Sequence, residues 1–327
     1  MTHFITSNML IFVLGALFLH ATEALNGVIR LPSHLQSSGL REATRMMPPF
    51  GTMVAFRAGK RSKKLVVNAG GAELLPMLSL PQEALVVNFV LASLIKLKGT
   101  RSLTDAGLLH AFFLGVGLWS TLGPAGWLYG VIYFVLGTLV TKVKMEEKKE
   151  LGIAEKRDGA RGAENVWGSA AISMLCALGL RFLSLSPLGA SALIVAFVAA
   201  LATKLSDTFG SEIGKAYGRT CYLITSFELV PRGTEGAVSV EGTLAGVGAS
   251  LLMAAASHTL GLTQGPLASS AVIVAAFIAT TAESYIGAIF QDRVPWLTNE
   301  LVNLLNTLIG AVVGFTTVYL ASSPRMG

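Results

Sequence analysis

The stretch KLSDTFGSEIG, residues 204–214, places ionisable and hydroxyl side chains directly after a long apolar run. If that run is a helix that continues into the stretch, Lys204, Asp207 and Ser211 fall on one face by their three- and four-residue spacings. Glu212 lies at the edge of this face. Carboxylate oxygens fit a Mg²⁺ ion, and a lysine beside them fits a phosphate group. The stretch therefore predicts Lys204, Asp207 and Glu212 as catalytic residues, with the two acids as metal ligands; the alternative is a solvated helix end with local ion pairs.

A second polar group, EKRDGARGAENVWGSAA, covers residues 155–171 and precedes another apolar segment. It contains Arg157, Arg161 and Asn165. Arginine can hold a phosphate through paired hydrogen bonds, so we expect these residues to bind substrate or nucleotide phosphates. The alternative is that the arginines only reflect the positive charge that flanks membrane segments on one side.

A glycine-rich stretch, PRGTEGAVSVEGTLAG at residues 231–246, leads into a further apolar segment. Backbone amides exposed ahead of a helix N-terminus form an anion site. We therefore predict phosphate contacts from Gly233, Thr234, Gly236 and Ser239. The stretch is not a Walker A loop, because the GK[ST] ending is absent, and tight packing explains a glycine-rich turn about as well.

Acids and amides also lie on the last two apolar segments. Glu283 stands inside apolar sequence, and Asn299, Glu300 and Asn303 begin the final segment. A buried asparagine amide brings two donors and two acceptor lone pairs that need partners. We expect these four residues to line the site or to support the residues that do.

The elements that position these groups belong to a membrane protein. The 327 residues are 52% hydrophobic and only 13% charged, and the mean hydropathy is +0.62, whereas soluble domains carry about a quarter charged residues. Apolar runs recur from about residue 84 to the end, which predicts an all-α, polytopic bundle of about 7–8 transmembrane helices in a lipid bilayer. The net charge of +6 lies in loops and an N-terminal stretch without interleaved aromatics, so no nucleic-acid partner is expected.

Eight apolar segments can be marked. They cover about 84–96, 103–121, 125–141, 166–184, 188–204, 240–258, 267–287 and 301–320. The loops after the second, fourth and sixth segments carry no charged residue, and all the other loops are charged. This alternation places every charged loop on one face, the stromal or cytoplasm-equivalent side by the positive-inside tendency. An active site is expected on that face.

The N-terminus has the composition of a targeting sequence. A short apolar run at 9–19 is followed by a small-x-small pattern, which predicts a signal peptide over 1–24. Residues 25–70 are rich in Lys, Arg, Ser and Thr and poor in acids, which is typical of a plastid transit peptide. Together they resemble the bipartite address of proteins imported into complex plastids, and we expect an integral plastid-membrane protein. The alternative is an anchor helix followed by a basic disordered segment.

Four motifs stand in one order along the chain: KLSDTFGSEIGKAYG, PRGTEGAVSVEGTLAG, AESYIGAIFQ and LTNELVN. With them, roughly residues 85–320 resemble the family that contains transmembrane protein 19 and the plastid phytyl-phosphate kinase. The resemblance implies a kinase-like membrane domain over 84–320. It implies phosphoryl transfer from a nucleoside triphosphate, with CTP as the expected donor, to phytyl phosphate or a related prenyl phosphate. The product would be the diphosphate used for tocopherol and phylloquinone synthesis.

Two other functions stay open. A CTP-dependent cytidylyltransferase acting on a lipid phosphate would release pyrophosphate instead of a nucleoside diphosphate. An ion or metabolite transporter would use Asp207 and Glu283 as an ion path, and inverted repeats or broken helices near the midplane would be expected. The sequence shows no clear repeat, and its polar groups gather at one face, which favours an enzyme.

Overall fold

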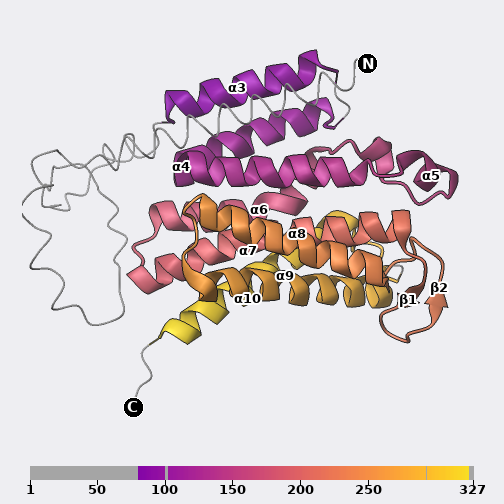
Figure 1. The fold of residues 1–327 in the computed structure, drawn as a ribbon. Helices are drawn as coiled ribbons and strands as arrows, with labels where there is room; N and C mark the ends of the chain where they lie inside the picture. The colour runs from indigo at the N-terminus through magenta and orange to yellow at the C-terminus, as the bar shows by residue number, and fades with distance from the viewer. Residues whose placement is uncertain (1–79, 100–101, 292, 324–327) are drawn as a thin grey trace, which may run out of the picture. The chain divides into compact units, whose positions relative to one another are not determined.

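The computed structural model describes residues 80–99, 102–291 and 293–323, so the predicted leader segments 1–24 and 25–70 lie outside the described residues. The protein is an all-α bundle with one small sheet (Figure 1). Its elements in chain order are α3 (Gln82–Leu97), α4 (Asp105–Thr141), α5 (Met145–Glu150), η2 (Lys156–Gly159), α6 (Ala163–Phe182), α7 (Pro187–Tyr217), β1 (Cys221–Leu223), β2 (Leu229–Val230), β3 (Ala237–Val238), α8 (Val240–Thr259), α9 (Gly265–Ile286), η3 (Gly287–Gln291) and α10 (Asn299–Ser322). The predicted fold class is confirmed.

Helix α4 is a hairpin of two arms. Its helical run is interrupted at Gly123, where φ is 68° and ψ is −164°, and Pro124 follows directly. Gly107 packs against the backbone of Arg161, and Gly137 packs against the guanidinium of the same residue. In a straight helix these two glycines would be about 45 Å apart. The two arms therefore account for two of the predicted segments, and all eight are present as helices.

Helix α7 is the central element, since it packs against α4, α6, α8, α9 and α10. Its middle is lined with small residues, which let neighbouring backbones approach closely. Gly310 of α10 lies against Thr203, and Gly314 lies against Ala199. These two glycines therefore let α10 pack closely against α7.

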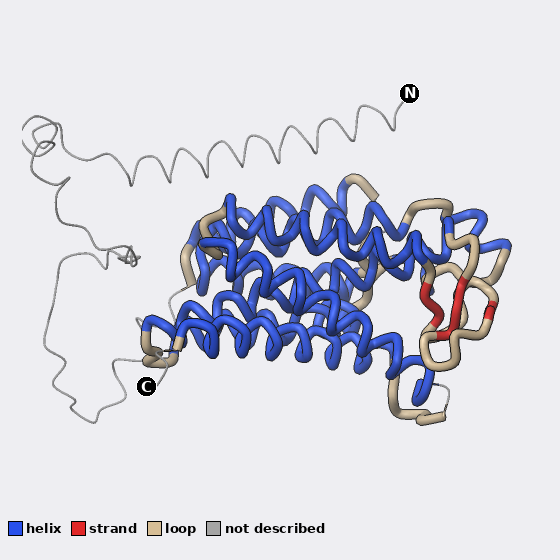
Figure 2. The backbone as a smooth tube through the Cα atoms, turned by 60° about the horizontal axis from the view of Figure 1, so that its bottom comes forward, coloured by secondary structure: helices blue, strands red, loops and turns tan. Residues whose placement is uncertain are grey.

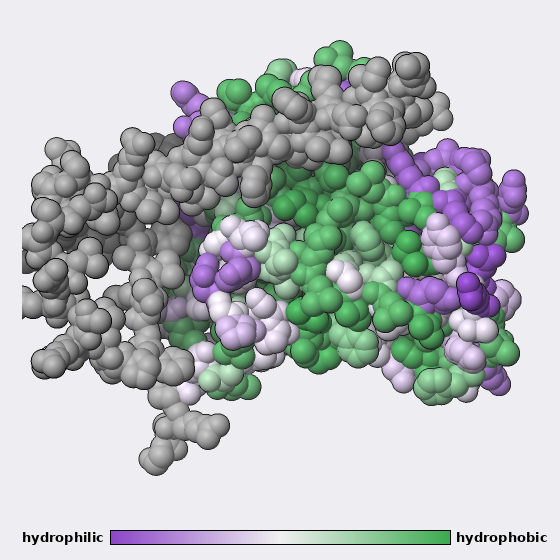
Figure 3. Space-filling model, in the orientation of Figure 1, coloured by the Kyte–Doolittle hydropathy of each residue, from purple (hydrophilic) through white to green (hydrophobic). Residues whose placement is uncertain are grey.

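Five of the described helices are long and apolar enough to cross a membrane: α4, α7, α8, α9 together with η3, and α10. Apolar side chains cover much of the visible side of the bundle, and hydrophilic residues gather at one end (Figure 3). This banding matches a protein whose sides face lipid and whose end faces water.

The charged loops meet at that end. The three-stranded antiparallel sheet, in the order β2-β1-β3, lies there beside the loop that carries α5 (Figure 2). Lys215 Nζ donates to Glu155 Oε1 at 3.0 Å, and Arg232 Nη1 donates to Glu147 Oε1 at 3.4 Å. A parallel backbone bridge between Leu103 and Arg161 also joins the loop before α4 to the α5–α6 connection. The predicted convergence of the charged loops is confirmed.

Candidate functional site

An open cavity of about 770 Å³ lies at the charged end of the bundle. Residues from α4, η2, α6, α7, α8, α9, α10 and the loops around the sheet line it. Every predicted site residue contributes to its wall: Arg157, Arg161, Asn165, Lys204, Asp207, Glu212, Gly233, Thr234, Gly236, Ser239, Glu283, Asn299, Glu300 and Asn303. The structure thus brings together residues from five separate stretches of the sequence, while their individual roles stay predictions.

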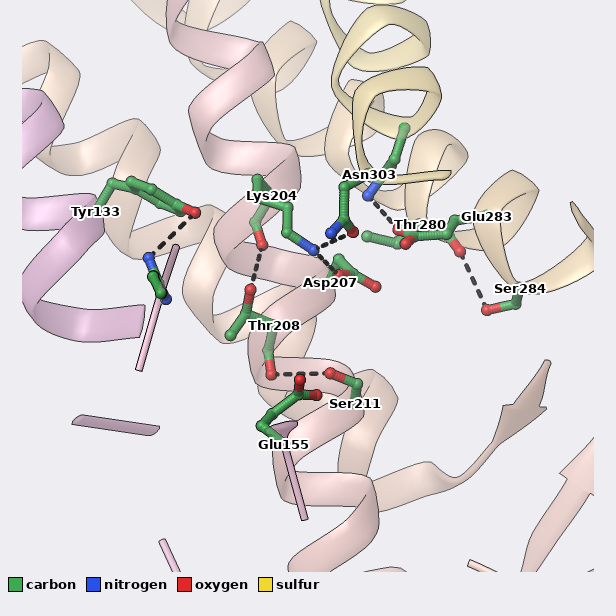
Figure 4. A network of polar contacts seen from close by, with 12 residues as sticks. Tyr133, Glu155, Lys204, Asp207, Thr208, Ser211, Thr280, Glu283, Ser284 and Asn303 are labelled. Atoms are coloured by element: carbon green, nitrogen blue, oxygen red, sulfur yellow. Dashed lines mark hydrogen bonds and ion pairs between the residues drawn. The ribbon is translucent and has the colours of Figure 1, made fainter. Parts of the chain in front are cut away.

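Lys204 lies at the centre of the polar groups. Helix α7 continues as predicted to Tyr217, which carries Lys204 and Asp207 on one face. The ammonium Nζ donates to Asp207 Oδ2 at 2.5 Å and to Asn303 Oδ1 of α10 at 2.6 Å (Figure 4). Only 10% of the Lys204 side chain is exposed. A carboxylate and an amide therefore fix one positive charge at the wall of the cavity.

A second carboxyl group stands beside this pair. Glu283 of α9 lines the same cavity wall as Asp207 and interacts electrostatically with it, and its Oε2 accepts a hydrogen bond from Asn306 Nδ2. The buried Oδ1 of Asn306 has no partner among the described residues. Mg²⁺ is commonly held by one or two carboxylates together with substrate phosphates, and Asp207 with Glu283 provides that number of acids. In the described part of the chain, no three or more His, Cys, Asp or Glu side chains lie together in a group that could hold a metal ion.

Glu212 occupies a different environment from Asp207. Its carboxylate is buried and pairs with Lys148 Nζ of α5, and that ammonium also donates to the Thr141 carbonyl oxygen at 2.8 Å. Residues five positions apart on a helix point about 140° away from each other. Glu212 therefore points away from Asp207, and Glu283 is the acid that lies on the Asp207 side of the cavity. The metal role predicted for Glu212 stays a prediction, which its position does not support.

Glu155 is a cavity residue that the sequence reasoning missed. Its carboxylate accepts the hydrogen bond from Lys215 and also interacts with Glu212. Burial raises the pKa of Glu155, but the charge and hydrogen bond of Lys215 and the charge of Lys204 outweigh burial, and the net shift is downward. Glu155 is therefore ionised at neutral pH. It lies in a loop without helical periodicity, so its sequence position carried no signal.

The two predicted phosphate-binding arginines differ in their partners. Arg157 Nη2 donates to Glu164 Oε1 at 2.5 Å and to Asn165 Oδ1 at 2.6 Å. Arg161 lies over the ring of Tyr133, 5.5 Å from its centroid, and donates to its hydroxyl at 3.4 Å. Within the described ranges no ion pair joins Arg161 to a carboxylate. Its charge is thus available to an anion, whereas that of Arg157 is already neutralised.

With this geometry in place, the chain can be compared with known proteins. The family described as "Integral membrane protein DUF92" matches residues 87–311. The chain belongs to the DUF92 family. An uncharacterized membrane protein of Synechocystis is 49% identical to this DUF92 protein over 235 residues, which are 70% of this chain and 88% of the relative.

Two further relatives extend the comparison of this DUF92 protein. Protein VTE6, chloroplastic, of Arabidopsis thaliana is 47% identical over 231 residues, covering 69% of this chain and 67% of the relative. An uncharacterized membrane protein of Methanocaldococcus jannaschii is 33% identical over 233 residues, covering 71% and 91%. No solved structure matches the chain significantly. The predicted family is confirmed.

The glycine-rich motif of this DUF92 protein closes one side of the cavity. Gly233 and Gly236 have positive φ values of +84° and +75°, which favour glycine. Gly236 also packs against Ala288 at the end of α9, where a Cβ atom would clash with backbone. The Ser239 hydroxyl accepts from the Gly242 amide at 3.1 Å and caps α8. Packing and capping thus account for part of this motif, and its phosphate contacts stay a prediction.

The first turn of α10 ties the far wall to α6. Asn165 Nδ2 donates to Glu300 Oε1 at 3.3 Å, and Asn303 holds Lys204. Asn299 lines the cavity next to them. The LTNELVN motif therefore contacts α6 through the Glu300 carboxylate and α7 through the Asn303 amide.

Proposed function

We propose that this protein transfers a phosphoryl group from a nucleoside triphosphate, with CTP as the expected donor, to phytyl phosphate or a related prenyl phosphate. The observation that carries the proposal is the arrangement of Lys204, Asp207 and Glu283 in a cavity that also receives Arg161. The motif resemblance and the similarity to protein VTE6, chloroplastic, support the same activity. The similarity also supports a plastid membrane as the location.

The chemistry requires positioning and charge neutralisation. The acceptor phosphate oxygen is already ionised, so it attacks the terminal phosphorus without a strong base. The new oxygen–phosphorus bond forms while the bond to the nucleoside diphosphate breaks, and the electron pair stays on that leaving group. Fixed cations beside the transferred group, here Lys204 and Arg161, stabilise charge that spreads over its oxygens.

A magnesium ion is part of this proposal. Asp207 and Glu283 are the residues that would hold it, because both carboxyl groups line the cavity and interact electrostatically. Bound Mg²⁺ supplies positive charge against the nucleotide phosphates. The remaining positive charge comes from the side chains of the chain itself.

The direct test uses the purified protein with Mg²⁺, phytyl phosphate and each nucleoside triphosphate in turn. The expected products are the prenyl diphosphate and a nucleoside diphosphate. Release of pyrophosphate would identify a cytidylyltransferase instead. Absence of any nucleotide turnover, together with ion or solute flux in vesicles, would identify a transporter.

The orientation of the charged end toward the stroma is a second part of the proposal. Single cysteines introduced into 142–165 should react with an impermeant reagent from the stromal side only, and cysteines in 258–266 from the opposite side only. Both natural cysteines are buried, and burial raises the pKa of the Cys221 thiol, which keeps background labelling low. Labelling of both groups from one side would contradict the single polar face.

A further inference from the structure

An apolar groove lies beside the polar cavity, between α3, α4, α6 and α7. Its walls include Leu91, Phe112, Val131 and Leu201, and its surface is almost entirely apolar. Four residues line both spaces. These shared residues are Tyr133, Arg161, Asn165 and Ser169. The groove and the cavity therefore adjoin at these four residues.

The groove leads from the polar cavity toward the uncharged end of the bundle. On the second arm of α4 it extends from Tyr133 to Trp127, a rise of about 9 Å, and on α6 from Asn165 to Ser173, about 12 Å. Asn88 stands at the far end, and its Oδ1 accepts a hydrogen bond from Trp127 Nε1 at 3.0 Å. Its amide nitrogen is bonded within α3. Asn88 and Trp127 are thus paired, whereas the buried hydroxyl of Ser173, which also lines this end, has no partner among the described residues.

The junction carries a cation that has no carboxylate partner among the described residues. Arg161 is fixed there by its backbone bridge to Leu103, and its guanidinium lies 5.5 and 5.7 Å from the ring centroids of Tyr133 and Phe134. A permanent cation at the mouth of an apolar groove is complementary to an amphiphile with an anionic head and a hydrocarbon tail. A single groove accommodates one hydrocarbon chain, which fits a prenyl chain rather than a phospholipid with two acyl chains.

We propose that this groove binds the hydrocarbon chain of the prenyl monophosphate acceptor, with the acceptor phosphate on Arg161. The inference rests on the proposed function for its choice of ligand. This placement also divides the polar cavity between the two substrates. The acceptor phosphate lies on Arg161, and Lys204, Asp207 and Glu283 on the neighbouring wall are left to the phosphates of the donor nucleotide. The two phosphate groups would then meet between Arg161 and Lys204, both of which line the same cavity.

Photolabelling tests the groove without requiring catalysis. The probe is a C20 prenyl monophosphate that carries a diazirine on its chain, applied without nucleotide to the full chain. Label is expected on peptides of α3, α4 and α6. Ala111→Trp and Ala92→Trp fill the groove from two different walls and should reduce this label by roughly tenfold or more, since losing contact with even two methylene groups has an effect of that size.

The matched control is Ala255→Trp, which adds the same side chain at an exposed alanine of α8 outside the groove. It should label like the unmodified chain. Label that falls mainly elsewhere, or that survives in both groove variants when these elute as folded protein, overturns the inference. Efficient competition by phosphatidate, which has two acyl chains, overturns the assignment to a prenyl chain.

Kinetics give an independent readout. The ratio of kcat/KM for a C20 acceptor to that for a C5 acceptor should fall roughly tenfold or more in the two groove variants and stay unchanged in Ala255→Trp. An equal loss for both chain lengths overturns the inference. If the unmodified chain labels in the groove but turns over no nucleotide, the proposed function fails and the groove assignment stands.

Discussion

Helix α7 takes part in two lysine–carboxylate pairs less than three turns apart, and their surroundings differ. Lys204 pairs with Asp207, and the two side chains are 10% and 19% exposed at the cavity wall. Glu212 pairs with Lys148, and these side chains are only 1–2% exposed. Glu212 also lines the cavity, but a pair whose charged groups are almost fully enclosed exchanges a partner for a ligand far less readily than a pair that is partly exposed. Burial therefore separates a pair that holds α5 to α7 from one that can meet phosphate.

The largest expected effect comes from breaking the enclosed pair. Lys148→Met leaves the Glu212 carboxylate buried without its cation, and the free energy of unfolding should fall by about 3–5 kcal/mol. Thermal unfolding in detergent measures the loss. The double variant Lys148→Met/Glu212→Leu removes both charges and should recover most of the stability, because an apolar pair of similar volume replaces the ion pair.

An unchanged stability in Lys148→Met would contradict this distinction. It would mean that water or an ion already reaches the Glu212 carboxylate. Glu212 would then return to the acids available for a metal, as the sequence analysis predicts.

The pair at the cavity wall should respond in the opposite way. Asp207→Asn keeps the shape of the side chain but removes its charge, and turnover should fall roughly 100- to 1000-fold, as expected for one key electrostatic group. The melting temperature should change little, because a neutral amide is easier to bury than a carboxylate. Turnover with phytyl phosphate and a nucleoside triphosphate, measured beside a melting curve, checks both parts.

Glu228→Gln is the matched control, since Glu228 is exposed in the connection between β1 and β2 and does not line the cavity. It should retain most of the activity. Near-normal turnover of Asp207→Asn with an unaltered dependence on Mg²⁺ would make the Lys204–Asp207 pair structural, like the enclosed one.

Contacts within one helix are the part of this comparison that the sequence predicts well. Lys204 and Asp207 are three residues apart, so the periodicity of α7 alone places them on one face. The partner of Glu212 lies 64 residues earlier in the chain, in the six-residue helix α5 (Met145–Glu150), whose charges look like those of any solvated loop. Packing between distant helices also brings Glu283 to Asp207, and no local pattern encodes that contact.

The overall fold is easier to predict from the sequence than the contacts of the site, because it depends on composition and on loop charge. Apolar runs of membrane-spanning length predict the helices, and the alternation of charged and uncharged loops predicts the common polar end. The hairpin in α4 follows from Gly123 and Pro124, which separate two apolar segments. The cavity, its neighbouring groove and the partners of each charge depend on three-dimensional packing, which one sequence does not specify.

Arg161 extends the comparison to a cation without a carboxylate partner in the described part of the chain. Arg161→Lys keeps the charge but loses the paired hydrogen bonds, so the KM for the prenyl phosphate should rise roughly 10- to 100-fold, since a hydrogen bond to a charged group contributes about 1.5–3 kcal/mol. Arg219→Lys, at an exposed position outside the cavity, is the control. A rise in the KM for the nucleotide instead would move Arg161 to the donor side.

The smallest expected effect concerns the half-exposed pair of Glu155 and Lys215, which lies between the two extremes. Its side chains are 40% and 22% exposed, and Nζ and Oε1 are 3.0 Å apart. The folded pKa of Glu155 lies below its ordinary value of 4.5. The folded state therefore binds fewer protons than the unfolded state in this range, and the pair stabilises the protein above pH 4.5. That stabilisation is lost as the pH falls through the folded pKa.

Glu155→Gln should therefore lower the free energy of unfolding by about 0.2–1 kcal/mol at pH 7, as for other partly exposed pairs. The difference from the unmodified chain should shrink toward zero as the pH is lowered below 4.5, because protonation then removes the same charge. Melting curves of both proteins from pH 7 downward give this difference directly, since all other titrating groups are shared. A difference that stays constant or grows on acidification would show that Glu155 acts through packing rather than charge, and would place its pair beside the enclosed one as a purely structural contact.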